Sequence, residues 1–144
     1  MEIEIDSIRA DRIQPRKPLI LVVDDDLSHH KLLELLAEQL GIMVCVASSC
    51  ADAINSLGRL SIDAIMMDCR MPHVDGHACT KRIRVLNEST RQIPIIAVTA
   101  NLQSDNQQKC MDCGMDDFLG KPFTIEELHD KLWFWLKMRM KAEK

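Results

Sequence analysis

The sequence predicts an α/β fold, in which a doubly wound parallel sheet of five strands carries helices on both faces. Two observations lead to this class. Short apolar runs alternate five times with segments of helical periodicity, and such alternation requires parallel strands joined by helical crossovers. The runs are also continuously apolar, as in Leu19–Val23, which is typical of strands buried on both faces. The length of 144 residues suits one domain of this kind.

The chain divides into a short polar segment and one folded domain. Residues 1–17 are polar and contain Pro15, and Pro18 stands at the boundary. We predict a linker or disordered arm over 1–17 and a single domain over 18–144.

The first half of this domain is expected to hold three strands and two helices. The first strand, 19–23, ends at three consecutive acids. A helix follows over 28–40, with leucines at helical spacing and Gly41 suited to its C-terminal cap. The next elements are a strand at 42–47, a helix at 51–60 and a strand at 62–67 that ends at Asp68.

The second half completes the alternation. A helix is predicted over 75–87, followed by a strand over 95–98. Pro94 stands at the start of this strand, where its missing N–H removes no hydrogen bond from the interior of the sheet. The remaining elements are a helix at 103–113, a strand at 115–119 and a last helix that Thr124 and Glu127 begin with a capping box. Right-handed crossovers leave few topologies, and we expect the flavodoxin-like strand order 2-1-3-4-5.

Composition excludes several classes of function. The chain has 18 basic and 22 acidic residues, a formal charge of -4, which disfavours binding to a phosphate backbone and so predicts no nucleic-acid partner. All five aromatic residues lie between Phe118 and Trp135, so base-stacking platforms elsewhere are excluded. No run approaches the roughly 18–20 apolar residues of a transmembrane helix. The acidic N-terminus lacks the apolar core of a signal peptide.

The cysteines predict a reducing compartment. Six cysteines are scattered among apolar segments, at positions 45, 50, 69, 79, 110 and 113, and we interpret all six as reduced thiols rather than a disulfide framework. Cys110 and Cys113 form a single CxxC without a second ligand pair at zinc-site spacing. We therefore expect them to be two small, partly buried side chains on a helix.

Polar residues stand at the ends of four predicted strands. The first strand is followed by Asp24 and Asp25, the third by Asp68, the fourth by Thr99 and the fifth by Lys121. Each alone has an ordinary explanation, such as a turn, a helix cap or a surface amine. In the expected strand order, however, all five would converge on one pocket. Three close carboxylates repel one another unless a cation is present, and hard oxygen ligands suit Mg²⁺, while Thr99 and Lys121 suit phosphoryl oxygens.

Four segments carry a resemblance to a known family: ILVVDDD (20–26), IMMDCRMPHVDG (65–76), PIIAVTAN (94–101) and GMDDFLGKPF (114–123). In order and spacing, the chain from about Leu19 to Lys137 resembles a response-regulator receiver domain of two-component phosphorelays. The sequences of the motifs MDCRMP and GMDDFLGKPF look most like those of the receivers of hybrid sensor histidine kinases.

The resemblance implies a role for each matched residue. Asp68 would be the phosphoacceptor that takes a phosphoryl group from a phosphohistidine. Mg²⁺, with Mn²⁺ as a substitute, would be held by Asp25, Asp68 and the backbone carbonyl of Arg70, and by Asp24 through water. Thr99 and Lys121 would bind phosphoryl oxygens. The domain would then catalyse its own phosphorylation and dephosphorylation without being a conventional enzyme.

The resemblance also implies a signalling switch. Thr99 would move toward the phosphoryl group while Phe118, in place of the tyrosine often found there, turns inward. The Lys121–Pro122 peptide is expected to be cis. The rim of the pocket would comprise Ala100, Asn101 and Pro122, and we hypothesise that Arg70 and Asn101 tune dephosphorylation.

The implied partners are a histidine kinase, a histidine-phosphotransfer domain or both. The first-helix face that carries Ser28, His29 and His30 would meet them. Three consecutive rings, Trp133 to Trp135, cannot all face one core, so self-association through the last helix is a further expectation. The location implied is cytoplasmic, for a stand-alone shuttle or for the cytoplasmic part of a membrane-bound sensor kinase.

Two alternatives remain. The first is a receiver-like interaction module that is not phosphorylated, which retention of the five strand-end residues disfavours. The second is a nucleotide or flavin enzyme of the same architecture. Neither GxGxxG nor GxxxxGK[ST] occurs, and acids stand where an anionic phosphate would bind.

Overall fold

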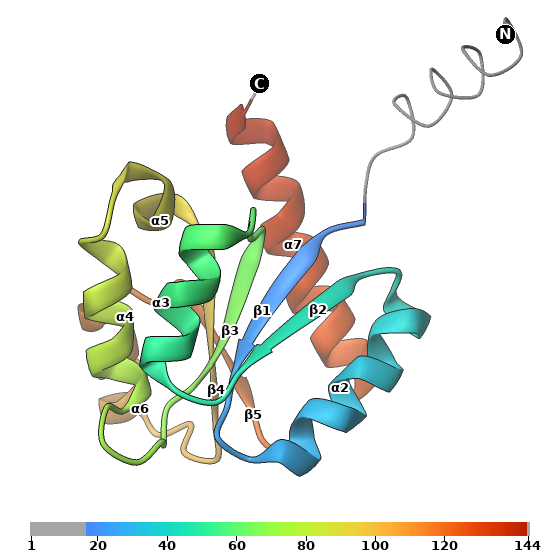
Figure 1. The fold of residues 1–144 in the computed structure, drawn as a ribbon. Coiled ribbons are helices and arrows are strands. Elements are labelled where there is room, and N and C mark those ends of the chain that lie inside the picture. The colour runs from blue at the N-terminus through green and yellow to red at the C-terminus, as the bar shows by residue number, and fades with distance from the viewer. Residues whose placement is uncertain (1–16, 144) are drawn as a thin grey trace, which may run out of the picture.

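Five parallel strands form the centre of the molecule (Figure 1). The computed structural model describes residues 17–143, so the predicted arm over 1–17 lies outside the described residues except for Lys17. The sheet order is β2-β1-β3-β4-β5, which confirms the predicted topology. The strands are β1 (Leu19–Val23), β2 (Met43–Ala47), β3 (Ala64–Asp68), β4 (Ile95–Thr99) and β5 (Asp117–Gly120).

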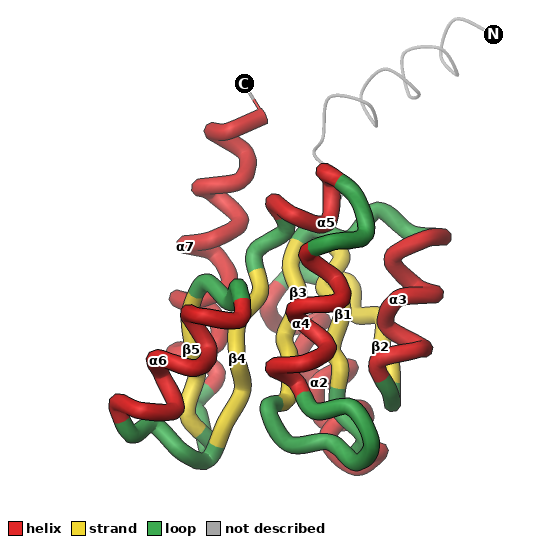
Figure 2. Tube along the Cα trace, turned by 90° about the vertical axis from the view of Figure 1, so that its left-hand side faces the viewer, coloured by secondary structure: helices red, strands yellow, loops and turns green. Residues whose placement is uncertain are grey.

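Helices cover both faces of the sheet. They are α2 (Leu27–Leu40), α3 (Cys50–Arg59), α4 (Gly76–Arg84), α5 (Glu88–Gln92), α6 (Ser104–Cys113) and α7 (Ile125–Glu143). One face is covered by α2 and α7, and the other by α3, α4 and α6 (Figures 1 and 2). None of the described helices is long and apolar enough to cross a membrane.

The two faces have different cores. Alternate strand residues point to opposite faces, so Leu21 and Met67 pack with α3, α4 and α6, whereas Ile20 and Met66 pack with α2 and α7. All six cysteines belong to the first core, whereas Trp133 and Trp135 pack at the edge of the second. The first core is therefore rich in sulfur, and the second is built from aliphatic side chains and indole rings.

The predicted helix over 75–87 is wrong at its C-terminal end. The chain leaves α4 at Arg84 and begins a separate short helix, α5, at Glu88. The Asn87 side chain starts it by accepting a hydrogen bond from the Thr90 N–H at 2.9 Å, and the Asn87 N–H donates to Thr90 Oγ1. Such a reciprocal cap favours a new helix over continuation of the old one.

The prediction of six reduced cysteines is wrong for two of them. Cys50, at the start of α3, and Cys79, in α4, form a disulfide with their Cα atoms 5.6 Å apart. Sequence spacing could not reveal this pair, because the two helices meet only after they pack on the same face of the sheet. Cys45, Cys69, Cys110 and Cys113 are free thiols.

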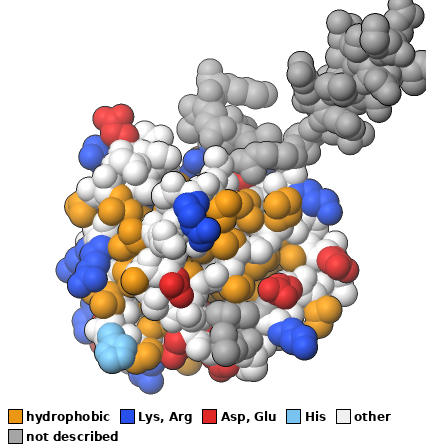
Figure 3. Space-filling view, viewed as in Figure 1, with side chains coloured by type: hydrophobic (Ala, Val, Ile, Leu, Met, Phe, Trp, Pro, Cys, Tyr) orange, Lys and Arg blue, Asp and Glu red, His pale blue; other side chains and the backbone are white. Residues whose placement is uncertain are grey.

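The last helix arranges its aromatic residues as expected. Leu128, Leu132 and Leu136 are buried, whereas Phe134 is 55% exposed. Thr124 caps the helix by accepting a hydrogen bond from the Glu127 N–H at 3.1 Å. On the face shown in Figure 3, basic side chains are scattered among acidic and apolar ones, which fits the modest net charge.

Candidate functional site

Three carboxylates meet at the carboxyl edge of the sheet. Asp24 follows β1, and Asp68 is the last residue of β3; both are buried, while Asp25 is exposed. The three residues each offer a carboxylate oxygen, and these oxygens lie within 4.8 Å of one another. The β1–β3 pairing brings them together, because it aligns the ends of the two strands.

The three consecutive acids after β1 have different local roles. Asp24 Oδ1 accepts a hydrogen bond from the Asp26 N–H at 2.9 Å, which turns the chain out of the sheet. Asp26 is the N-cap of α2, and its side chain accepts from the Ser28 N–H at 3.0 Å. The run therefore supplies two candidate metal ligands and one helix cap.

Asp68 lies between a cation and a backbone donor. The Lys121 ammonium is 3.5 Å from Asp68 Oδ2 and 3.9 Å from Asp24 Oδ2. The other Asp68 oxygen accepts a hydrogen bond from the Arg70 N–H at 3.0 Å. The Lys121–Pro122 peptide is cis, as expected.

Burial is the main influence on the ionisation of Asp68. It raises the pKa of Asp68 above its ordinary value, and the neighbouring Asp24 carboxylate adds to this, whereas the Arg70 N–H and Lys121 act against it. The net direction is upward, so the Arg70 N–H and Lys121 do not offset the effect of burial on this carboxylate. The three acids also outnumber the Lys121 cation beside them. A set of oxygen ligands with this excess of negative charge fits a hard divalent cation such as Mg²⁺.

Thr99 ends β4 at the same edge of the sheet, but its hydroxyl is held by the following loop and by the first turn of α6. It accepts hydrogen bonds from the Asn101 N–H at 3.0 Å and from Asn106 Nδ2 at 3.4 Å. Thr99, Asn101 and Asn106 line a hollow that they share with Cys69. A neighbouring hollow is lined by Asp24, Asp68, Lys121 and Pro122. The structure thus divides the predicted pocket between two adjacent hollows.

The other predicted site residues lie around these hollows. Arg70 lines the same hollow as Thr99. Both Arg70 and Ala100 are exposed. Phe118 is half-buried on β5, and the Lys131 ammonium lies 5.9 Å from its ring centroid. The side chains of His29 and His30 lie outside the described part of the molecule.

Gly76 is a positioning residue that the sequence reasoning missed. At this position a Cβ atom would overlap the backbone carbonyl of Asp68 and approach Cys69 Cα to 2.9 Å. The Gly76 N–H donates to the Cys69 carbonyl at 3.1 Å. The start of α4 therefore packs directly against the backbone of Asp68, and the glycine that ends the segment 65–76 was the available signal.

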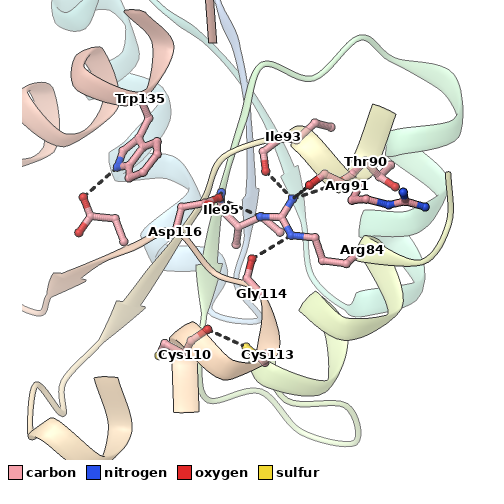
Figure 4. Close-up of polar contacts among 11 residues, drawn as sticks. Arg84, Thr90, Arg91, Ile93, Ile95, Cys110, Cys113, Gly114, Asp116 and Trp135 are labelled. Carbon is pink, nitrogen blue, oxygen red and sulfur yellow. Dashed lines mark hydrogen bonds and ion pairs between the residues drawn. The ribbon is translucent and has the colours of Figure 1, made fainter. Parts of the chain in front are cut away.

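A second missed feature is the cluster of hydrogen bonds around Arg84 (Figure 4). Its guanidinium pairs with Asp116 at 2.8 Å, and Asp116 also accepts from the Ile95 N–H at 2.8 Å. The remaining Arg84 bonds go to the backbone carbonyls of Thr90, Arg91, Ile93 and Gly114, at 2.7–3.0 Å. One side chain thereby joins α4 and α5 to the end of α6 and the start of β4.

Asp117, at the start of β5, forms a third polar cluster. Its carboxylate accepts hydrogen bonds from Lys131 at 2.7 Å and from Trp135 Nε1 at 2.8 Å. Burial tends to raise the pKa of Asp117, but these two donors and the Phe118 N–H outweigh it, so that the pKa is lowered. The contact fixes α7 against β5 beside Phe118.

Comparison with protein families defines the class. The model of the response regulator receiver domain matches residues 20–133, which is most of the chain. The protein therefore belongs to the receiver-domain family of two-component signalling.

Its relatives include sensor kinases. The chain is 36% identical over 124 residues to the sensor histidine kinase RcsC of Escherichia coli, covering 86% of this chain and 13% of that protein. It is 35% identical over 124 residues to the hybrid signal transduction protein dokA of Dictyostelium discoideum, covering 86% of this chain and 7% of that protein. The chain thus corresponds to a small part of these relatives.

Solved structures show the same fold. The receiver domain of sensor histidine kinase PA1611 from Pseudomonas aeruginosa has a TM-score of 0.77 and 37% identity, covering 84% of this chain and 98% of that one. That crystal structure has a magnesium ion coordinated in the active-site cleft. The chemotaxis protein CheY4 of Vibrio cholerae has a TM-score of 0.78 at 24% identity, covering 82% and 98% of the two chains, and supports the fold alone.

Proposed function

We propose that this receiver domain takes a phosphoryl group from a phosphohistidine onto Asp68 in a Mg²⁺-dependent reaction and passes the signal to a protein partner. The observation that carries the proposal is the position of Asp68. Its carboxylate is buried beside two further acids, and the Lys121 ammonium lies 3.5 Å from one of its oxygens. This arrangement combines a nucleophile with the positive charge that phosphoryl transfer requires.

In the proposed transfer, a carboxylate oxygen of Asp68 forms a bond to phosphorus while the phosphorus–nitrogen bond of the donor breaks. The imidazole nitrogen keeps the electron pair of the broken bond. The Arg70 N–H holds one Asp68 oxygen at 3.0 Å, and Lys121 pairs with the negative charge that spreads over the phosphoryl oxygens. Orientation and charge neutralisation by these groups supply much of the catalysis.

The acid cluster fits the expected metal. Asp25, Asp68 and the Arg70 carbonyl would hold Mg²⁺ directly and Asp24 through water, with Mn²⁺ as a substitute. The presence of magnesium in the PA1611 receiver supports this assignment. When bound, the ion neutralises charge on the carboxylates and the phosphoryl group.

The proposed switch begins at Thr99. Its hydroxyl is bonded to Asn101 and Asn106, so reaching a phosphoryl group on Asp68 requires it to exchange these partners. Phe118, half-buried beside Lys131, would change position with it. Ala100, Asn101 and Pro122 would form the rim of the pocket, and Arg70 and Asn101 would tune dephosphorylation. A kinase or phosphotransfer domain would dock on the neighbouring face of the first helix, which carries Ser28, His29 and His30.

Self-association through α7 is proposed as one output. Phe134 is 55% exposed and lines a shallow groove with Asp117, Leu119 and Lys131. Sedimentation of the phosphorylated chain should show a dimer that Phe134→Ser weakens. We also propose a cytoplasmic location, either for the free domain or within a sensor kinase like its relatives.

The transfer is tested by intact mass. The chain is incubated with Mg²⁺ and either acetyl phosphate or a phosphorylated histidine donor. Wild type should gain the mass of one phosphoryl group, whereas Asp68→Asn should gain none. Asp112→Asn, which removes an exposed carboxylate on α6, is the matched control and should behave as wild type.

Two results would reject the proposal. If neither donor adds mass to the wild type, the chain is a receiver-like interaction module that signals without phosphorylation. If Asp68→Asn gains as much mass as Asp112→Asn, the phosphoryl group is on another residue.

A further inference from the structure

A second group of possible metal ligands lies beside the acid cluster. Cys69 directly follows β3, His77 is in α4 and Cys110 is in α6. The Cys69 and Cys110 sulfurs are 3.9 Å apart, and His77 Nε2 is 3.5 Å from the Cys110 sulfur. All three ligand atoms lie within 4.8 Å of one another.

These separations match a tetrahedral zinc site. With bonds of about 2.3 Å to sulfur and about 2.0–2.1 Å to nitrogen, a tetrahedral ion places two sulfurs about 3.8 Å apart and a sulfur and a nitrogen about 3.6 Å apart. The Cys69–Cys110 and Cys110–His77 distances are already within about 0.2 Å of these values. Only the separation of Cys69 and His77, which is at most 4.8 Å, would need to shorten.

Burial and charge favour Zn²⁺ over other ions. Cys110 is fully buried, and Cys69 is 5% exposed. Two thiolates, one neutral imidazole and Zn²⁺ have no net charge, so the loaded site adds no uncompensated charge to the core. A monovalent copper ion would leave one negative charge, and Mg²⁺ prefers oxygen ligands.

The surroundings leave one position of the tetrahedron accessible. Cys69 and His77 line the hollow that also contains Asp75 and Asn106. Three protein ligands and one open position facing such a hollow are the arrangement of zinc sites that accept water or another small ligand.

Cys113 has a different role from Cys110, although the two form the CxxC of α6. The Cys113 thiol donates to the Cys110 carbonyl at 3.1 Å, within its own helix turn. The prediction of no zinc at this CxxC considered only ligand pairs at zinc-site spacing along the chain, whereas Cys110 meets its candidate partners, Cys69 and His77, from other elements.

We propose that Cys69, His77 and Cys110 form a Zn²⁺ site, separate from the acid cluster around Asp68. On binding, each thiol loses its proton to solvent and the imidazole donates the lone pair of Nε2. The proposal does not depend on phosphorylation of Asp68.

The test uses Co²⁺ as a spectroscopic probe for the full chain, with free thiols kept reduced by a phosphine. Wild type should bind one Co²⁺ with a thiolate-to-metal charge-transfer band, and one equivalent of Zn²⁺ should remove this band. Carboxylate ligands give no such band, so binding at Asp24, Asp25 and Asp68 is distinguished. Cys69→Ser and Cys110→Ser should each abolish it.

Three further variants make the assignment specific. His77→Gln, at a half-buried helix position, should keep the fold and lower the affinity by more than about tenfold. Cys113→Ser is the matched control and should retain the band, as should a Cys50→Ala/Cys79→Ala variant that lacks the disulfide. Circular dichroism checks that each variant is folded.

The proposal is overturned by any of three results. Wild type could give no thiolate band; the band could persist in Cys110→Ser; or a folded His77→Gln could bind Co²⁺ as tightly as wild type.

Discussion

Two clusters of possible metal ligands lie next to each other at the carboxyl edge of the sheet. They differ in the chemistry of their ligand atoms and in the elements that supply them. The acid cluster of Asp24, Asp25 and Asp68 offers hard oxygen ligands, whereas the sulfur cluster of Cys69, His77 and Cys110 offers soft ones. Asp68 and Cys69 are neighbours in the chain, yet they serve different clusters. Strand alternation explains this, because consecutive residues at a strand end point to opposite faces.

The two clusters differ in how they are assembled. The acids come directly from the ends of paired strands, so the β1–β3 register alone brings them together. The sulfur cluster requires α4 and α6 to pack at one particular rotation on the same face. A change in helix packing should therefore disturb the sulfur cluster more than the acid cluster.

The largest expected effect is that of Lys121→Met, which should impair the acid cluster and leave the sulfur cluster unaffected. Lys121→Met removes the cation 3.5 Å from Asp68, and loss of one such charge should slow phosphorylation by about 10²–10³-fold. The Co²⁺ band of the sulfur cluster should be unchanged. Intact mass followed over time measures the rate, and Lys137→Met, exposed on α7, is the control. An unchanged rate would remove Lys121 from the mechanism.

Gly76→Ala should damage both clusters. The added methyl group overlaps the Asp68 carbonyl and approaches Cys69, so α4 must shift. We expect a loss of about 2–3 kcal/mol in the free energy of unfolding, measured by urea denaturation. Gly58→Ala is the matched control, because nothing lies within 4 Å of its added Cβ, and it should be neutral or stabilising. Equal stability of the two variants would contradict the close approach of α4.

Arg84→Met tests whether helix packing affects one cluster more than the other. It removes the ion pair with Asp116 and the bonds to four carbonyls, which should cost about 2–3 kcal/mol of unfolding free energy. Because Arg84 ties α4 to the end of α6, Co²⁺ affinity should fall more than the phosphorylation rate does. Arg82→Met, on the exposed side of α4, is the control. A fall in rate as large as the fall in affinity would show that both clusters depend on helix packing.

The smallest expected effect is a difference in pH dependence between the half-buried Asp117 and the buried Asp68. The lowered pKa of Asp117 means that its contribution to stability is present above the unfolded value near 3.8 and is lost as pH falls through the folded value. Asp117→Asn should therefore lower the unfolding free energy by about 1–2 kcal/mol at pH 6 and by less near pH 2.

The effect of Asp68 on the pH dependence of stability is opposite to that of Asp117. Its raised pKa means that ionisation costs stability as pH rises above 3.8, so Asp68→Asn should increase the unfolding free energy at pH 7 when a chelator is present. Denaturation across pH 2–7 measures both variants. Parallel pH profiles for the two would contradict the opposite environments assigned to these carboxylates.

Sequence predicted the parts of the molecule that depend on strand order. The five strands, their topology and the meeting of Asp24, Asp25 and Asp68 follow from apolar runs and from the residues that end them. Helical periodicity predicted that the three rings from Trp133 to Trp135 cannot all face one core, and the exposed ring is Phe134. The hydrogen bonds of Thr99 with Asn101 and Asn106 could not be predicted in this way, because they depend on the conformation of the loop after β4 and on where α6 begins.

Three of the missed features depend on side chains that meet across elements distant in the sequence. The Cys50–Cys79 disulfide, the Arg84–Asp116 pair and the approach of His77 to Cys110 each require the relative placement of two packed elements. Periodicity tells which face of a helix is buried but not which residue lies opposite. The separate helix α5 was missed for a more local reason. The polar residues around Asn87 also suit the exposed end of one long helix, so the sequence did not show that Asn87 caps a new one.

The hydrogen bonds of Arg84 have a consequence for how freely this sequence can diverge. Three of its partners, Thr90, Arg91 and Ile93, contribute only backbone carbonyls, which every amino acid provides. The Arg84 contacts therefore place no demand on the side chains at these positions, although burial constrains Thr90 and Ile93, whereas the ion pair requires both Arg84 and Asp116. The exposed positions between α4 and β4 should therefore accept many residues, whereas the segment is held by Arg84 and Asp116, by the Asn87–Thr90 cap and by the buried Ile93.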